Sequence, residues 1–107
     1  MVDDDESIRL LCRLNLELDG WRVHDAGTLQ QARTELDTYD IRVVLLDVHL
    51  GTGSGLDFLD ELRRERPQLK VALLTGSAEV SETAGDGVIP KPFTIEQLTA
   101  TVANLAG

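Results

Sequence analysis

The stretch Ile41-Arg42-Val43-Val44-Leu45-Leu46-Asp47 decides the fold, because it is a nearly continuous apolar run that ends in a carboxylate. A run of this kind, rich in β-branched residues, predicts a strand buried on both faces of a parallel sheet. The pattern recurs at Lys70–Thr75 and, more briefly, at Val88-Ile89. We also expect a short strand over residues 21–26.

Helical patterns occupy the intervals between these strands. The first covers residues 7–19 and is followed by Gly20, a residue typical of the position just after a helix end. We expect one apolar stripe along this helix, made of Ile8, Leu11, Cys12, Leu14 and Leu18.

Three further helices carry start signals. Thr28 and Thr94 are each followed three residues later by glutamine, which is the spacing of a capping box. Ser54 caps the helix between them, and Pro67 closes it. The side chains expected to face the core are Leu29, Ala32, Leu36, Leu56, Leu59, Leu62, Ile95, Leu98, Val102 and Leu105. This alternation of helix and strand predicts an α/β fold, a parallel sheet with helices on both faces.

The composition describes one acidic globular domain over residues 1–107, since 11.7 kDa is too little for two domains. Hydrophobic residues at 42% and charged residues at 27% argue against global disorder. The 19 acidic and 10 basic residues give a net charge of −9, so we expect no direct nucleic-acid binding by this domain, because phosphate binding needs a basic patch. Aromatic residues at 4% leave little for base stacking.

Three features predict a cytoplasmic protein without a membrane segment. Cys12 is the single cysteine, so no internal disulfide forms and a reducing compartment is expected. Residues 1–6 are acidic where a signal peptide would be basic. Apolar runs such as 43–46 are far shorter than the roughly 20 residues that cross a bilayer.

Polar side chains follow the ends of the expected strands. Asp47, Thr75 and Lys91 each stand at or just after a strand end, and Asp3 and Asp4 follow the short apolar start of the chain. In open α/β sheets the ligand site lies at the carboxyl ends of the strands. We therefore expect these five residues to meet at one rim of the sheet.

This set of side chains suits phosphoryl chemistry. Three carboxylates at close range repel one another, and a hard divalent cation such as Mg²⁺ relieves that repulsion. A carboxylate can also attack phosphorus and form an aspartyl phosphate. The Lys91 ammonium and the Thr75 hydroxyl are suitable donors to phosphoryl oxygens.

Four motifs stand in order at the strand ends. They are Val2-Asp3-Asp4-Asp5-Glu6-Ser7-Ile8-Arg9, Leu45-Leu46-Asp47-Val48-His49-Leu50 with Gly55-Leu56 after it, Leu74-Thr75-Gly76-Ser77, and Lys91-Pro92-Phe93. Together they resemble the CheY-like response-regulator receiver domain of two-component signalling, over nearly the whole chain. The resemblance implies a flavodoxin-like parallel sheet of order 2-1-3-4-5 with helices on both faces.

The resemblance also implies the site. Asp47 would accept a phosphoryl group from a phosphohistidine on a sensor histidine kinase or phosphotransfer protein. Asp3 and Asp4 would hold Mg²⁺, Asp4 more directly, helped by Asp47 and the backbone carbonyl of His49.

The remaining implied roles concern switching. Thr75 would hydrogen-bond the phosphoryl group, and Lys91, aimed by a cis Lys91-Pro92 bond, would pair with the aspartate or its phosphate. Phosphorylation would thereby shift the conformation of the segment 76–90 and so control an effector domain or a downstream protein. A homodimer is a further expected partner.

Three features depart from the pattern of that family. The first strand is abbreviated to Met1-Val2, so we expect the chain to start further upstream or another group to fill the gap. The segment between Thr75 and Lys91 is more than one helical turn shorter than usual, so we expect the fourth helix of the family to be vestigial or mobile here. Val88 stands where the family has a switch aromatic.

The leading hypothesis is a signalling domain that is not an enzyme, and two alternative functions remain. A Mg²⁺-dependent phosphatase of the haloacid dehalogenase type also uses a strand-end aspartate as its nucleophile. Such enzymes carry the pattern Asp-x-Asp there, with the second aspartate as acid and base, whereas this chain has His49 two residues beyond Asp47. A receiver-like interaction module that is not phosphorylated is favoured modestly by Val88 and by the shortened segment before Lys91.

Overall fold

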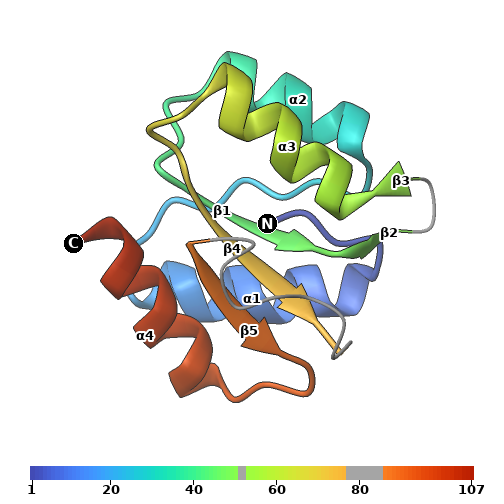
Figure 1. Cartoon of the computed structure of the whole chain (residues 1–107). Coiled ribbons are helices and arrows are strands. Elements are labelled where there is room, and N and C mark those ends of the chain that lie inside the picture. The colour runs from blue at the N-terminus through green and yellow to red at the C-terminus, as the bar shows by residue number, and fades with distance from the viewer. Residues whose placement is uncertain (51–52, 77–85) are drawn as a thin grey trace.

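The computed structural model describes residues 1–50, 53–76 and 86–107 (Figure 1). In chain order the helices and strands are α1 (Glu6–Leu18), α2 (Leu29–Thr38), β1 (Val43–Asp47), β2 (His49–Leu50), β3 (Gly53–Ser54), α3 (Gly55–Glu65), β4 (Lys70–Thr75), β5 (Gly87–Pro90) and α4 (Ile95–Ala106). The predicted elements are present close to their predicted bounds, except for the strand over 21–26. The small antiparallel pair β2–β3 was not predicted from the sequence.

The main sheet is parallel, and its order agrees with the predicted one. β1 pairs with β4 along its whole length, and β4 pairs with β5. On the other edge of β1, Val2 forms single parallel bridges to Leu46 and to Ala26. The order across the sheet is therefore Ala26, Val2, β1, β4 and β5, which is 2-1-3-4-5 with single residues in the first two places.

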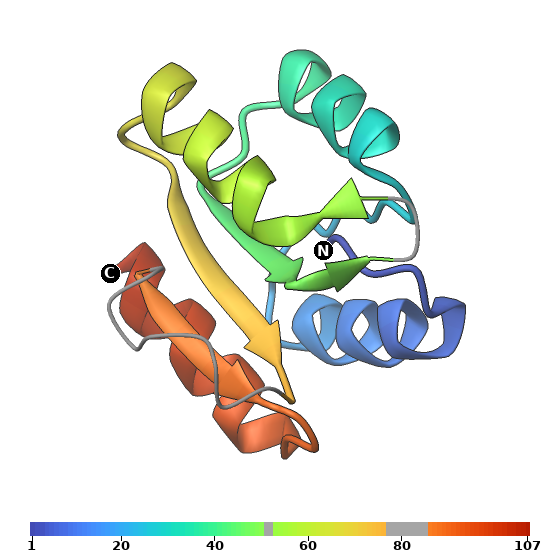
Figure 2. The ribbon, with the colours of Figure 1, turned by 45° about the vertical axis from the view of Figure 1, so that its right-hand side comes forward.

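Two layers of helices cover this sheet, α2 and α3 on one face and α1 and α4 on the other (Figures 1 and 2). The core under α2 and α3 includes Val44, Leu46, Val71, Leu73, Leu36 and Phe58. The core under α1 and α4 includes Leu45, Ala72, Leu74, Cys12, Leu16 and Leu98. Alternate residues of β1 and β4 thus enter opposite cores, which explains why both strands are apolar at consecutive positions.

Side-chain caps fix the predicted helix starts, with one difference in detail. Thr94 and Gln97 form a complete capping box at the start of α4. At α2, Thr28 accepts the N–H of Gln31, but the Gln31 side chain accepts the N–H of Gly27 instead of that of Thr28. The second capping box is therefore only half formed.

The apolar stripe predicted for α1 is wrong in part. Ile8, Cys12 and Leu16 face the core, and they are spaced four residues apart on one side of the helix. Three predicted members of the stripe are instead exposed, namely Leu11, Leu14 and Leu18. The sheet covers a narrower strip of the helix than the apolar pattern suggests, and the same holds in α3 for Leu56, which is 39% exposed.

The strand predicted over residues 21–26 does not form. Only Ala26 pairs, through its bridge to Val2. Among the described residues, the main-chain bonds between this segment and the start of the chain join Ala26 to Met1 and Asp3 and join His24 to Met1, which is too few for a ladder. Ala26 is buried, Trp21 and Val23 are partly buried against the core under α1 and α4, and Arg22 is exposed, so the segment packs in part without forming a ladder.

Residues 77–85, which make up most of the segment predicted to be shortened, lie outside the described residues, so the expectation for the fourth helix of the family is not addressed. Val88 lies in β5 and is half-buried. Within the three described ranges, none of the helices is both long and apolar enough to cross a membrane.

Candidate functional site

The rim at the carboxyl ends of the strands brings the predicted residues together. Asp47 is the last residue of β1, Thr75 is the last residue of β4, and Lys91 comes directly after β5. Asp3 follows the bridging residue Val2. Register between the strands aligns these ends, because Asp47 pairs with Leu74 and Thr75 pairs with Pro90.

Asp3 is the most deeply buried charged group of this rim, with no exposed surface. Its Oδ1 accepts the N–H of Asp5 at 2.9 Å, and its Oδ2 lies 3.1 Å from the Nζ of Lys91. The Arg9 guanidinium donates to the backbone carbonyl of Asp3 at 2.7 Å and pairs with Asp25 at 3.4 Å. The position of Asp3 is thus fixed through both its side chain and its main chain.

Asp47 is 5% exposed, and among the described residues each of its two carboxylate oxygens has a donor nearby. Its Oδ1 accepts the N–H of His49 at 3.2 Å, and its Oδ2 lies 3.5 Å from the Nζ of Lys91. Burial, followed by the negative charge of Asp3, raises the pKa of Asp47 above its ordinary value, although the His49 N–H and Lys91 oppose that rise. The charged form of Asp47 is therefore short of compensating positive charge.

Lys91 is held between the two buried carboxylates. Its backbone N–H donates to the Thr75 carbonyl at 2.9 Å, and the Lys91-Pro92 bond is cis, as the resemblance implied. Burial alone would lower the pKa of the Lys91 ammonium, but the hydrogen bond and charge of Asp3, and then those of Asp47, outweigh burial and raise it. Lys91 is therefore a cation at neutral pH.

The acidic group at this rim fits a small divalent cation. One carboxylate oxygen from each of Asp3, Asp4 and Asp47 lies within 4.8 Å of the other two. Mg²⁺ binds oxygen ligands at about 2.0–2.1 Å, so ligands on opposite sides of it are about 4.1 Å apart. Asp4 is the exposed member of this group, and an all-oxygen set suits Mg²⁺ better than it suits softer metals. The contribution expected from the His49 carbonyl stays a prediction.

The end of β1 lies directly against the start of α3. The Gly55 N–H donates to the Val48 carbonyl at 3.1 Å. A Cβ atom at Gly55 would collide with the Asp47 carbonyl oxygen and would lie 2.8 Å from the Cα of Val48. The glycine of the second motif therefore permits a close approach that sets the backbone of Asp47.

Residues 1–103 match the family described as the response regulator receiver domain. The chain belongs to this family. Receiver domains of this kind are signalling domains of two-component systems, so the leading expectation from the sequence is confirmed and the phosphatase alternative is not favoured.

Two curated relatives of this receiver domain are transcriptional regulators. The probable transcriptional regulatory protein TcrX of Mycobacterium tuberculosis is 36% identical over 104 residues, which are 92% of this chain and 44% of TcrX. The KDP operon transcriptional regulatory protein KdpE of Escherichia coli is 34% identical over 105 residues, which are 94% of this chain and 47% of KdpE. The receiver domain thus spans about half the length of these relatives.

The fold is also shared with a solved response regulator. TrrA of Thermotoga maritima, determined in complex with Mg²⁺-BeF, superposes with a TM-score of 0.87 and 28% sequence identity, covering 97% of this chain and 94% of that one. The CheY-like, flavodoxin-like fold expected from the sequence is therefore confirmed.

Sequence reasoning missed the part played by Arg9. It was quoted only as the last residue of the first motif, yet it ties the Asp3 carbonyl to Asp25 across the gap between α1 and the segment 21–26. The available signal was a basic side chain three residues after the acidic run Asp3-Asp4-Asp5-Glu6.

Proposed function

We propose that Asp47 of this receiver domain is the phosphoryl acceptor. In the reaction, the bond between phosphorus and the imidazole nitrogen of a donor phosphohistidine breaks as a bond forms to a carboxylate oxygen of Asp47. The donor would be a sensor histidine kinase or a phosphotransfer protein, as the family resemblance implies.

The observation that carries the proposal is the setting of Asp47. Its carboxylate is nearly buried at a strand end, an ammonium lies 3.5 Å away, and two further carboxylates share one small acidic hollow with it. A structural aspartate with this burial would be expected to be neutralised by its neighbours, whereas here negative charge exceeds positive charge. This excess of negative charge is expected of a site that binds a cation.

Around Asp47, each neighbouring residue has a separate proposed task. Asp3, Asp4, Asp47 and the His49 carbonyl would hold Mg²⁺, which when bound supplies positive charge that offsets the repulsion between carboxylate and phosphoryl oxygens. Lys91 donates to a phosphoryl oxygen from the opposite side, and the Thr75 hydroxyl binds another.

The switch would act through the segment that follows Thr75. Drawing Thr75 and Lys91 toward the phosphoryl group would bias the segment 76–90, which joins the two residues. Hydrogen exchange with and without a phosphoryl mimic tests this step. Unchanged exchange across 76–90, in protein shown to bind the mimic, would contradict it.

Intact mass after incubation with Mg²⁺ and a small phosphodonor tests the proposal itself. The wild-type chain should gain one phosphoryl group, and Asp47→Asn should gain none. Asp60→Asn is the matched control, because Asp60 is an exposed aspartate on α3 and should leave the gain intact. A gain in the Asp47→Asn protein equal to that of the wild type would overturn the assignment.

The same family also suggests partners and setting. Residues 1–107 form one receiver unit, and its output passes to an effector domain or to a separate protein in the cytoplasm. Support comes from TcrX and KdpE, which are named as transcriptional regulators and are about twice as long as the matched region.

A further inference from the structure

The Arg9 guanidinium lies beside the acidic hollow and bonds to main chain there. Its Nη1 donates to the carbonyl of Asp3 at 2.7 Å, and its Nε lies 3.4 Å from the carboxylate of Asp25. The side chain is 19% exposed, which is low for an arginine, a residue that is mostly exposed in proteins. A short bond from a charged donor is among the stronger kinds of hydrogen bond. The start of the chain is therefore tied firmly to α1.

The carbonyl that Arg9 holds belongs to the peptide between two of the three clustered carboxylates. A peptide unit is planar, so the oxygen of Asp3 lies in one plane with the nitrogen and the Cα of Asp4. The side chain of Asp3 is fixed separately, by the N–H of Asp5 and by Lys91. The bond from Arg9 therefore bears most on Asp4, because it sets the point from which that carboxylate leaves the main chain.

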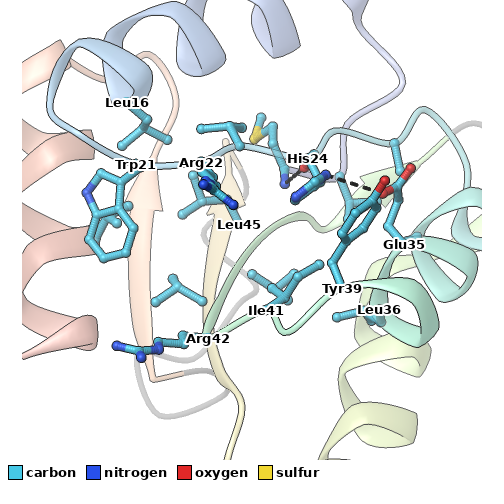
Figure 3. A pocket seen from close by; sticks show the side chains of 18 of the residues that line it. Leu16, Trp21, Arg22, His24, Glu35, Leu36, Tyr39, Ile41, Arg42 and Leu45 are labelled. Atoms are coloured by element: carbon cyan, nitrogen blue, oxygen red, sulfur yellow. Dashed lines mark hydrogen bonds and ion pairs between the residues drawn. The ribbon is translucent and has the colours of Figure 1, made fainter.

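Asp25, which anchors the guanidinium, lies on a segment that is itself held in place. The preceding residue, His24, stacks on Tyr39 with ring centroids 3.9 Å apart, and its Nδ1 lies 3.5 Å from the carboxylate of Glu35 (Figure 3). Glu35 belongs to α2, and Tyr39 caps the end of that helix. Segment 21–26 is therefore tied to α2, and Asp25 is a fixed anchor for Arg9.

Gly27 leaves the space that the guanidinium occupies. A Cβ atom at Gly27 would lie 2.9 Å from the Nη1 of Arg9 and 3.4 Å from its Cζ. Among the described glycines only Gly20 has a positive φ, so the missing side chain at Gly27 serves the close approach and not the backbone. The nitrogen that would be displaced is the one that donates to Asp3.

We propose that Arg9 is a positioning residue of the Mg²⁺ site, which holds the peptide between Asp3 and Asp4 so that their carboxylates fit a small cation. The inference rests on the Mg²⁺ site of the proposed function and adds to it a residue outside the ligand set. Mg²⁺ needs near-ideal octahedral geometry at about 2.0–2.1 Å, whereas Ca²⁺ accepts flexible geometry at about 2.3–2.6 Å. Arg9 should therefore favour Mg²⁺ over Ca²⁺.

The sign of the effect separates positioning from simple charge. Arg9 is a cation near a cation site, so its charge alone opposes metal binding, and its removal would strengthen binding. Loss of a residue that orients metal ligands has the opposite effect, and typically weakens metal binding by about 10–100-fold. A weaker site after removal of this positive charge is thus the mark of positioning.

Titration of Mg²⁺ and Ca²⁺ at constant ionic strength, followed by amide chemical shifts, tests the proposal. We expect Arg9→Met to raise the Kd for Mg²⁺ by about tenfold or more and the Kd for Ca²⁺ by clearly less. Arg13→Met is the matched control, because it removes the same charge from the same helix. Arg13 also lies 3.8 Å from Asp25, but its side-chain hydrogen bond goes to Glu17, so both Kd values should stay near those of the wild type.

Gly27→Ala tests the same bond without changing any charge. The added methyl group would push the Nη1 of Arg9, which is the far end of a flexible side chain and can yield, so the fold should keep its stability. We expect the Kd for Mg²⁺ to rise in this variant as well, while Tm without divalent ions stays near that of the wild type. A Kd equal to that of the wild type would overturn the role given to the Nη1 bond.

Two further results would overturn the positioning role. One is a Kd for Mg²⁺ in Arg9→Met that is equal to or lower than that in Arg13→Met. The other is an equal loss for Mg²⁺ and Ca²⁺, which is the result expected of general destabilisation. In either case Mg²⁺ binding by the wild type would leave the proposed function standing, whereas a wild-type chain that binds no Mg²⁺ would overturn the proposed metal site and this inference together.

Discussion

Asp3, Asp47 and Lys91 form a buried group in which two carboxylates share one ammonium. The Nζ of Lys91 lies 3.1 Å from Asp3 and 3.5 Å from Asp47. Charges about 4 Å apart near a protein surface interact by about 4 kcal/mol, so the uncompensated carboxylate matters energetically. The site without a cation is therefore under electrostatic stress that a divalent ion relieves.

This stress predicts that Asp47→Asn stabilises the Mg²⁺-free protein. The raised pKa of Asp47 means that the folded state binds more protons than the unfolded state just above the ordinary carboxyl pKa, so stability falls as pH rises through that window. At pH 7 the substitution removes the costly charge and should raise Tm by a few degrees. Thermal melts at pH 7 without divalent ions measure it.

Two comparisons sharpen that result. Asp60→Asn, at an exposed position, should leave Tm nearly unchanged. The gain from Asp47→Asn should shrink at low pH, where Asp47 is already protonated. A lower Tm for Asp47→Asn than for the wild type at pH 7 would show that Lys91 and His49 fully compensate the carboxylate.

Cys12 should be chemically inert in the native protein. It has no exposed surface, and burial, followed by the charge of Asp3, raises the pKa of its thiol to about 11. Because the thiolate is the nucleophile, alkylation at pH 8 should be slow in the folded chain and fast in denaturant, as read by intact mass. Equal rates in the two conditions would mean that α1 opens readily.

The acidic run at the start of the chain contains three aspartates whose different roles could not be predicted from residue type. Asp3 is buried against Lys91, Asp4 is exposed at the edge of the hollow, and Asp5 caps α1 by accepting the N–H groups of Ser7 and Ile8. Their side chains are identical, so composition cannot separate the three roles. The direction in which the chain leaves the sheet and enters α1 decides them.

At the scale of elements, the contact between β1 and α3 depends on one residue. Gly55→Ala would press a methyl group against the Asp47 carbonyl and the Val48 backbone, which cannot yield as a flexible side chain would. We expect a loss of about 1–3 kcal/mol in the free energy of unfolding, measured in urea. Gly76→Ala is the control, because the nearest atom that its added Cβ would meet in the described part of the chain lies 3.9 Å away. Equal stability of the two variants would contradict the packing described here.

The sequence predicted the strands correctly where both faces of the strand are buried. It predicted the helix starts correctly where the capping residues lie next to the helix in the sequence. The runs that form β1 and β4 enter two cores at alternate positions, so their apolar continuity was a direct sign of structure. The strand predicted over residues 21–26 was wrong because strand pairing depends on a partner far away in the sequence, which the local pattern does not reveal. The prediction that Leu11, Leu14 and Leu18 of α1 face the core was wrong, because an apolar stripe does not show how much of the helix surface the sheet covers.

For the whole molecule, Mg²⁺ should stabilise the folded state. An ion that binds only that state adds about 2.7 kcal/mol at a concentration 100 times its Kd. Tm should therefore rise with MgCl₂ and not with NaCl of the same ionic strength. Asp4→Asn should weaken the response, whereas Glu6→Gln, an exposed neighbour in the first turn of α1, should preserve it. An equal response in these two variants would place the ion elsewhere.

The meeting of distant segments was predictable from topology alone. In a parallel sheet with helices on both faces the carboxyl ends of the strands share one rim, so Asp47, Thr75 and Lys91 had to lie near one another. The contacts that tune the site were not predictable. The Arg9 bond to the Asp3 carbonyl and the approach of Gly55 depend on ångström-scale packing of α1 and α3.

Mapping the phosphorylated position tests the central claim most directly. The chain is treated with Mg²⁺ and a small phosphodonor, digested, and the peptide that carries the added phosphoryl group is identified by tandem mass spectrometry. The account predicts the group on Asp47, within the peptide that contains β1. A phosphoryl group found on Asp3, Asp4 or a hydroxyl side chain, with Asp47 unmodified, would contradict it.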